Sequence, residues 1–353
     1  MRTTILGRTG LEVVRIGCGG IPIIKESVDH AVAVVRAALE AGVNYFDNAR
    51  AYGDSEAKMG RALEGRRDEI ILATKTHGRD AKTATEYIET SLKELRTDRF
   101  DILQLHDIST ADLWDQVMAP GGAMEVAKQA REQGKTRFIG LSSHNPATLK
   151  KAIECGEFDT VLLTYNIASR WVEPEILPLA KERNVGVLVM KPLSGGAILD
   201  VPEQETGEHV GVTPEEGLRF VLSNDAVDVA LSGFQHPEEV PQNMAVLDDF
   251  KPITPEERRR LIEFGDGMGQ VFCRRCTYCM PCEEGIDIPK TLAILDHSER
   301  FPYEWPSQRR RYHELDVKPD ACIECGQCEE RCPFNVPIIE RLKKAKEKFD
   351  QPF

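Results

Sequence analysis

Eight of the ten cysteines lie in two short runs near the C-terminal end of the chain. The second run has the spacing C-x2-C-x2-C-x3-C-P and ends at Pro333. Three thiolates at positions i, i+3 and i+6 can wrap one corner of a cubane, and a fourth completes the ligand set of a 4Fe-4S cluster. The first run is a close variant, with Glu283 where proline is usual. We therefore expect two 4Fe-4S clusters, with ligands from Cys273, Cys276, Cys279, Cys282, Cys322, Cys325, Cys328 and Cys332.

Structural zinc is the alternative occupant of these runs, since paired C-x2-C units also bind Zn²⁺. Four evenly spaced cysteines and the C-P ending favour iron–sulfur ligation. A disulfide framework is not expected, because such frameworks belong to small secreted domains. The two remaining cysteines, Cys18 and Cys155, are predicted to be buried small hydrophobic residues.

A second group of residues suits proton transfer better than metal binding. A carboxylate, a phenol, an amine and an imidazole stand at or just after the ends of three successive predicted strands, at Asp47, Tyr52, Lys75 and His106. In a barrel of parallel strands, the chemistry takes place at the C-terminal ends of the strands. The four groups could therefore lie close together at the C-terminal end of the barrel.

The elements that must position these groups alternate between short apolar runs and segments of helical periodicity. The predicted strands span residues 14–18, 45–47, 70–75, 102–106, 138–142, 160–165, 186–190 and 229–232, and helices are predicted over 30–41, 84–95, 123–133, 174–182 and 214–222. Eight strand–helix units favour an α/β fold, a (β/α)8 TIM barrel, and residues 3–5 and 13–16 predict an N-terminal β-hairpin. A doubly wound sheet is the alternative, but G-x-G-x-x-G is missing after the first strand, where Pro22 takes the last position.

Over roughly residues 1–250 the sequence resembles the aldo-keto reductases, through Asp-x-Ala-x-x-Tyr-Gly, Thr-Lys and Leu-His-Asp in that order. The resemblance implies that Asp47, Tyr52, Lys75 and His106 form the catalytic tetrad. Hydride delivery to a carbonyl builds negative charge on oxygen, and Tyr52 would supply the proton that quenches it. Lys75 should lower the pKa of that phenol, Asp47 should hold Lys75, and His106 should orient the carbonyl oxygen.

The same resemblance places a nicotinamide cofactor, NAD(H) or NADP(H), against the later strands. The implied contacts are Ser142, His144, Asn166, Met190, Lys191, Pro192, Leu193, Gly195, Gly233, Gln235, Glu239 and Asn243. Leu162 and Met190 depart from the family pattern, which has Gln and an aromatic residue at these positions. Family members that use NADP carry Lys where this chain has Gly233 and Arg where it has Glu239. Because a carboxylate would repel the 2′-phosphate, we expect a preference for NADH.

Beyond the barrel the strand pattern stops and the clustered cysteines begin. We expect residues 1–250 to form the reductase barrel, 251–268 a linker helix, and 269–353 a mainly helical ferredoxin-like module. The whole chain resembles aldo-keto reductases that carry a C-terminal 4Fe-4S domain. In two-cluster ferredoxins the fourth cysteine of each run ligates the other cluster, which here predicts that Cys332 joins the first run and Cys282 joins the second.

Composition limits the partners. The formal net charge of −13 argues against nucleic acid or an anionic membrane as the main partner. No apolar run is long enough to span a bilayer and the N-terminus lacks a signal-peptide pattern, so we expect a cytoplasmic protein. The expected partners are a small carbonyl substrate and a possible electron-transfer protein.

Two functions remain open from the sequence. The first is an NAD(P)H-dependent oxidoreductase that reduces an aldehyde or ketone to an alcohol and carries iron–sulfur clusters with a structural or regulatory role. The second is an electron-transfer or redox-sensing protein whose barrel binds nicotinamide nucleotide. Nicotinamide passes two electrons as hydride and each cluster passes one, and no flavin fingerprint that could convert between them is present.

Overall fold

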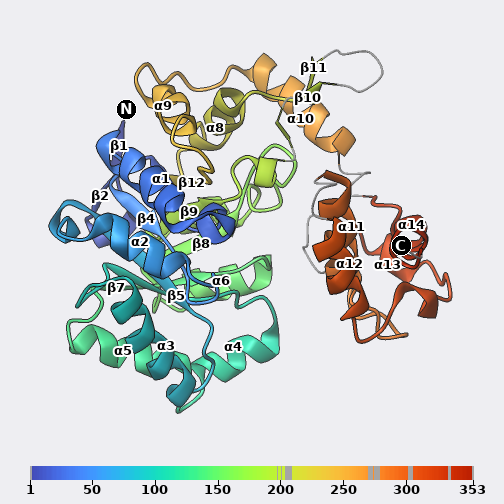
Figure 1. Ribbon diagram of the computed structural model, residues 1–353, viewed down its shortest axis with the longest axis horizontal. Coiled ribbons are helices and arrows are strands. Elements are labelled where there is room, and N and C mark those ends of the chain that lie inside the picture. The colour runs from blue at the N-terminus through green and yellow to red at the C-terminus, as the bar shows by residue number, and fades with distance from the viewer. Residues whose placement is uncertain are drawn as a thin grey trace. The chain divides into compact units, whose positions relative to one another are not determined.

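The computed structural model describes residues 2–196, 198–199, 201–202, 209–268, 273, 279–300, 305–332 and 335–351. The chain divides into two compact units, Met1–Arg258 and Arg259–Phe353. Figure 1 shows strands enclosed by helices in the first unit and a group of helices in the second. No helix in the described part of the chain is long and apolar enough to cross a membrane.

Eight parallel strands form a closed barrel in the order β12-β3-β4-β5-β6-β7-β8-β9, which confirms the predicted (β/α)8 fold. They are β3 (Ile16–Gly19), β4 (Tyr45–Asp47), β5 (Ile71–Thr76), β6 (Ile102–Leu105), β7 (Phe138–Ser142), β8 (Thr160–Thr164), β9 (Gly186–Met190) and β12 (Val229–Ser232). The first strand begins two residues later than predicted, because Val14 pairs with Thr3 in the hairpin and not with the barrel.

Helices cover the outside of the barrel (Figure 1). They are α1 (Val28–Glu40), α2 (Ser55–Leu63), α3 (Ala81–Glu94), α4 (Ala111–Met118), α5 (Ala123–Glu132), α6 (Pro146–Glu154), α7 (Ile176–Glu182), α8 (Pro214–Leu222) and α9 (Glu239–Met244). Local side chains set several starts, since Ser27, Asp80 and Asn145 each accept a hydrogen bond from the first turn of the helix that follows. A short β10–β11 hairpin (Val201–Pro202 and His209–Val210) lies between β9 and α8.

The N-terminal hairpin pairs β1 (Thr3–Ile5) with β2 (Glu12–Val14), as predicted. Its buried residues Leu6, Leu11 and Val13 belong to the same hydrophobic cluster as the interior of the barrel. A Cβ on Gly7 would lie 2.2 Å from the backbone nitrogen of Gly186, the first residue of β9. The hairpin therefore lies against the N-terminal ends of the strands, and the opposite ends carry the candidate site.

The second unit is mainly helical, as predicted. It contains most of α10 (Pro255–Met268), followed by α11 (Ile288–Arg300), α12 (Trp305–His313), α13 (Gln327–Glu330) and α14 (Ile338–Phe349). The first turn of α10 belongs to the barrel unit, where Arg258 bonds Glu173 at 2.6 Å and Glu257 pairs with Arg219. One apolar cluster joins Leu295, Tyr312 and Phe349 from three helices, and a second contains Cys279 and Cys328.

Candidate functional site

Strand register brings the predicted acid and amine together inside the barrel. β4 pairs with β5 and β5 pairs with β6, with Lys75 opposite Gln104 in the second pair. The Lys75 ammonium donates hydrogen bonds to Asp47 Oδ1 and, at 2.6 Å, to the Asn48 carbonyl oxygen. Asp47 and Lys75 are 3% and 1% exposed, so this is a buried ion pair. Such a pair fixes both side chains, because either charge left alone would be strongly destabilising.

Tyr52 lies on the turn that follows β4, with its ring 5.0 Å from the Lys75 ammonium. The Arg50 guanidinium holds this turn, since it donates to the Gly53 carbonyl oxygen at 2.9 Å and pairs with Glu56 at 2.7 Å. Glu56 is fully buried and also accepts a 2.6 Å hydrogen bond from Thr74 on β5. The phenol is thus anchored to the strand that carries the lysine.

Charge and burial compete at this pair. Burial by itself lowers the pKa of Lys75, but Asp47 and Tyr52 outweigh it and raise that pKa above its ordinary value. Burial raises the pKa of Tyr52, and Lys75 offsets only part of the increase. Lys75 thus lowers the phenol pKa as expected, but desolvation of the phenolate exceeds this effect, and the pKa of Tyr52 lies above its ordinary value.

His106 lies just beyond β6 and completes the group. Its ring faces the Tyr52 ring edge-on, with centroids 5.6 Å apart. Burial, helped by the Lys75 charge, lowers the pKa of His106 to about 3. The imidazole is therefore neutral near pH 7 and keeps a ring N–H to donate. Arg79 holds the backbone here, donating to the His106 carbonyl oxygen at 2.7 Å.

The residues expected to contact the nicotinamide lie at or just after the C-terminal ends of β7, β8 and β9. The buried Ser142 hydroxyl accepts a 2.8 Å hydrogen bond from the Asp107 backbone, next to His106. His144 Nδ1 lies 3.1 Å from the Thr164 hydroxyl. The buried Asn166 side chain donates to the Lys191 carbonyl oxygen at 2.8 Å, so it ties the end of β8 to the end of β9.

The segment after β9 carries the next group of expected cofactor contacts. Met190 packs against the core of the barrel, and Pro192 is buried. A Cβ on Gly217 of α8 would lie 2.6 Å from Leu193, so these two positions are closely packed. Gly195 has φ +64° and an added Cβ would meet no heavy atom within 4 Å. The backbone at Gly195 is thus accessible and adopts a conformation that favours glycine.

The loop after β12 carries the last four expected contacts. Glu239 accepts hydrogen bonds from the backbone amides of Gln235 and His236, at 2.6 and 3.1 Å. Asn243 is buried and donates to the Ser232 hydroxyl at 2.8 Å. Gly233 is exposed, and an added Cβ would lie 2.9 Å from Pro22. The Glu239 carboxylate is therefore fixed on this loop.

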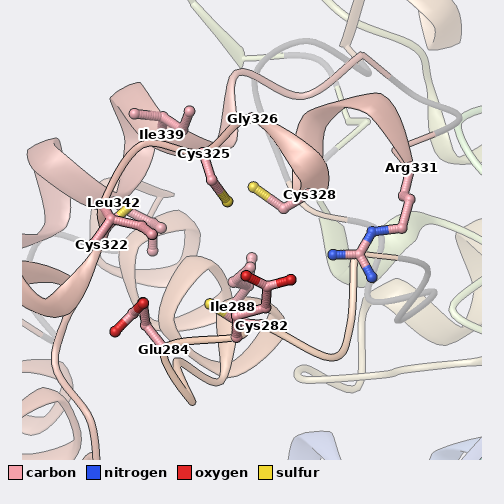
Figure 2. A pocket seen from close by; sticks show the side chains of 12 residues that line it. Cys282, Glu284, Ile288, Cys322, Cys325, Gly326, Cys328, Arg331, Ile339 and Leu342 are labelled. Atoms are coloured by element: carbon pink, nitrogen blue, oxygen red, sulfur yellow. The ribbon is translucent and has the colours of Figure 1, made fainter.

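Four cysteines from both runs line one pocket in the second unit: Cys282, Cys322, Cys325 and Cys328. In Figure 2 the side chains of Cys325 and Cys328 point toward each other across this space. Gly326, which lies between them in sequence, has φ +78° and permits the tight turn before α13. Cys328 is buried and Cys325 is exposed, so the pocket opens to solvent on one side.

The remaining predicted ligands lie in the same part of the unit. Cys273, Cys279 and Cys332 all belong to or pack against the apolar cluster that contains Cys328, while Cys276 lies outside the described residues. Within the described ranges, no three His, Cys, Asp or Glu side chains are close enough together to hold a single metal ion. Cys18 is buried as predicted, whereas Cys155 is exposed at the end of α6, so its predicted burial is wrong.

Residues 15–265 match a family model described as the Aldo/keto reductase family. The chain belongs to this family. Residues 272–336 of this aldo/keto reductase match a second model, the 4Fe-4S dicluster domain. Its family and the oxidoreductase names of its relatives identify the protein as an oxidoreductase enzyme.

Relatives of this aldo/keto reductase include the uncharacterised oxidoreductase YqkF of Bacillus subtilis, 26% identical over 74% of this chain and 95% of that protein. L-galactose dehydrogenase of Arabidopsis thaliana is 28% identical over 70% of this chain and 88% of that protein. Among solved structures, the holo form of aldo-keto reductase AKR11C1 from Bacillus halodurans gives a TM-score of 0.65 at 26% identity, covering 75% of this chain and 96% of that one. The structure of an aldo/keto reductase from Klebsiella pneumoniae in complex with NADP and acetate gives a TM-score of 0.60 at 25% identity. The match covers 74% of this chain and 94% of that one.

Sequence reasoning about this aldo/keto reductase missed two residues that contact the buried pair. Gln104 is fully buried on β6 and donates to Asp47 Oδ2 at 2.8 Å. Asn48 is also fully buried and bonds to Ser55 at 3.1 Å. Strand periodicity could have found Gln104, because it stands two residues before His106 and such residues share one face. No sequence pattern identifies Asn48, because it contacts Lys75 through its backbone carbonyl oxygen.

Proposed function

We propose that the barrel reduces an aldehyde or ketone to an alcohol with NAD(P)H, with Tyr52 as the general acid. The observation that carries this proposal is the buried Asp47–Lys75 pair beside Tyr52 and His106. These four groups match, in type and position, what proton delivery to a developing alkoxide requires. Overall, the carbonyl compound, NAD(P)H and a proton give the alcohol and NAD(P)⁺.

The cofactor, when bound, supplies the hydride that reduces the carbonyl carbon. Tyr52 donates its phenolic proton to the carbonyl oxygen, and the high pKa of the phenol keeps it protonated beforehand. Lys75 stabilises the phenolate that forms, and Asp47 keeps Lys75 in place. The neutral His106 donates a hydrogen bond to the carbonyl oxygen and so orients the substrate.

The proposed cofactor contacts fit a dinucleotide at two places. Accessible glycine backbone at Gly195 allows close approach of a pyrophosphate, and the Ser142 hydroxyl lies beside the tetrad, one residue of backbone from His106. The Klebsiella pneumoniae relative was solved with NADP. We nevertheless propose that this chain prefers NADH, because a fixed carboxylate at Glu239 would repel a 2′-phosphate.

The cofactor preference is tested by comparing kcat/KM for NADH and NADPH in the wild type and in Glu239→Arg. We expect the wild type to favour NADH and the variant to shift the ratio toward NADPH by about tenfold, the worth of one charged contact. Glu238→Arg, on the exposed neighbour, is the matched control. A wild type that favours NADPH would contradict the proposal.

For the C-terminal module, residues 269–353, we propose two 4Fe-4S clusters. Cys282, Cys322, Cys325 and Cys328 would hold the second, and the sharing of one pocket by these cysteines supports that set. Cys273, Cys276 and Cys279 with Cys332 would hold the first. Such clusters supply one-electron redox chemistry. Residues 1–250 would form the reductase barrel and 251–268 a linker helix between it and the module. The protein would be cytoplasmic, where the clustered thiols stay reduced before cluster assembly.

The reductase proposal is tested by aldehyde-dependent oxidation of NAD(P)H in anaerobically purified full-length protein. We expect turnover with simple aldehydes in the wild type and a loss of about 10²- to 10⁴-fold in Tyr52→Phe, the usual contribution of a general acid. Tyr87→Phe, on α3, is the control. Absence of aldehyde turnover in cluster-loaded wild type would overturn the proposal.

The exposure of Cys325 and of its neighbour Ile323, 61% exposed, favours a second candidate function. A cluster at this open edge could exchange single electrons with a protein partner or respond to oxidants. EPR of samples reduced with NADH and with dithionite separates the two proposals. Reduction of the clusters by NADH would favour a role in electron transfer. Reduction by dithionite but not by NADH would favour a structural or regulatory role for the clusters.

A further inference from the structure

Arg331 joins the two cysteine runs. Its Nη1 and Nη2 donate hydrogen bonds to the carbonyl oxygens of Met280 and Pro281, at 3.3 and 3.1 Å. Its Nε donates to the Gln327 carbonyl oxygen at 3.0 Å, at the start of α13. One planar guanidinium thus bonds to backbone on both runs. A second bond joins the same segments, from the Gln327 side chain to Glu283 at 3.0 Å.

The hydrogen bonds of Arg331 lie next to both cysteines that we propose cross between the runs. Arg331 immediately precedes Cys332, the proposed ligand that crosses to the first cluster. Two of the three carbonyl groups that it binds, those of Met280 and Pro281, lie directly before Cys282, the proposed ligand that crosses to the second cluster. Arg331 therefore fixes the chain at both crossing points, which are the points where exchanged ligands must be held in register.

Arg331 also lines the pocket that contains Cys282, Cys322, Cys325 and Cys328. Figure 2 shows its side chain extending from the end of α13 at one side of this pocket. In the described part of the chain no carboxylate lies within ion-pair distance of Arg331, although two carboxylates, Glu283 and Glu284, line the same pocket. Arg331 is thus the one cation among the described residues that line this pocket, and its hydrogen bonds go to neutral carbonyl groups.

We propose that Arg331 is a positioning residue that sets the reduction potential and the retention of the second cluster. This inference rests on the proposed ligand set of that cluster. Reduction adds one negative charge to a cluster that is already anionic with its four thiolates, and a cation held nearby stabilises the reduced form more than the oxidised form. The fixed charge therefore raises the reduction potential, and the carbonyl bonds slow the release of Cys282 and its cluster.

The test uses anaerobically purified full-length protein and three variants. Arg331→Gln removes the charge, Arg331→Lys keeps it but cannot span the same carbonyl groups, and Arg310→Gln removes a charge from an exposed position on α12. Iron and sulfide content, EPR-monitored redox titration and the rate of iron release to a chelator are measured for each. None of these readouts depends on turnover.

We expect Arg331→Gln to shift the potential of one cluster downward and leave the other unchanged, while Arg310→Gln shifts neither. Arg331→Lys should keep the potential near that of the wild type and release iron several-fold faster. Equal potentials in wild type and Arg331→Gln, or an equal shift in Arg310→Gln, would overturn the inference.

If Arg331→Gln does not retain iron, the Arg331→Lys variant provides the test. Iron release from Arg331→Lys that is no faster than from the wild type would also overturn the inference. A wild type without any 4Fe-4S signal would instead contradict the cluster proposal itself. Aldehyde reduction is a separate readout that all three variants should leave unchanged.

Discussion

The tetrad of the barrel and the cysteine pocket of the C-terminal unit are held together in different ways. In the barrel, Lys75 bonds directly to Asp47 and Asn48, and Gln104 bonds to the other oxygen of Asp47. In the C-terminal unit, Cys279 and Cys328 are part of the hydrophobic core, and further proposed ligands pack against them. The barrel site is thus complete from protein contacts, whereas the second unit builds its core around residues that we propose bind metal. We therefore expect loss of iron to affect the second unit and substitution of the tetrad residues to affect the barrel.

Removal of iron should have the largest effect, and only on the second unit. Because metal binding supplies folding free energy to small metal-binding domains, anaerobic chelation should abolish hydrogen-exchange protection in α11 and α14. The barrel helices α1 and α5 should keep theirs. Hydrogen exchange read by mass spectrometry checks both units in one sample. Equal loss of protection in the barrel, or none in α11, would contradict the comparison.

Substitution of Lys75 should affect the barrel alone. Lys75→Met leaves the buried Asp47 carboxylate without its partner, which should lower the free energy of unfolding of the barrel by about 3–5 kcal/mol. Chemical denaturation followed by far-UV circular dichroism measures this change. Lys135→Met is the control, because its partly exposed pair with Glu89 should contribute only about 0–1 kcal/mol. Similar losses in the two variants would show that the buried pair does not hold the barrel site.

Gln104 should act on catalysis through Asp47 without touching substrate. Gln104→Leu removes a hydrogen bond to a charged group, so we expect kcat to fall by roughly 30-fold, equivalent to about 2 kcal/mol, with little change in KM. Gln104→Glu should shift the pH profile upward, because a second carboxylate beside Asp47 favours its protonated form. Gln129→Leu, on the exposed face of α5, is the control. A rise in KM with unchanged kcat would assign Gln104 to substrate binding instead.

The smallest expected effect is a pH dependence from His106. Its pKa is about 3 in the folded barrel and about 6.5 in an unfolded chain. Below pH 6.5 the unfolded chain therefore takes up a proton that the folded barrel does not, and stability decreases as the pH falls toward 3. Between pH 7 and pH 5 the loss should be about 1–2 kcal/mol, after allowance for partial solvent screening. Unfolding free energies at both pH values should show a smaller loss in His106→Asn, and an equal loss would contradict this account.

The fold was predictable because its strands are buried on both faces and read as short apolar runs. β4, β7, β9 and β12 have the predicted bounds. Helices lie at all five ranges named from periodicity, with ends that differ from the expected ones by at most three residues.

The candidate site was predictable only where residue type carried the chemistry. The four tetrad residues could be named from their types and order, but Gln104 required knowledge of which face of β6 points inward. The direction of the Tyr52 pKa could not be predicted, because it depends on how burial balances against Lys75, a quantity that spacing in the sequence does not contain.

The most direct test of the central claim is a single-turnover reaction of the anaerobic full-length protein with NADH and an excess of aldehyde. The alcohol formed and the redox state of the clusters, read by EPR after rapid freezing, are measured in the same sample. We expect alcohol equal in amount to the NADH consumed, with cluster signals that match those of the protein before mixing. Reduced clusters with little or no alcohol would contradict carbonyl reduction by the barrel. That result would indicate that the barrel transfers electrons from NADH to the iron–sulfur module.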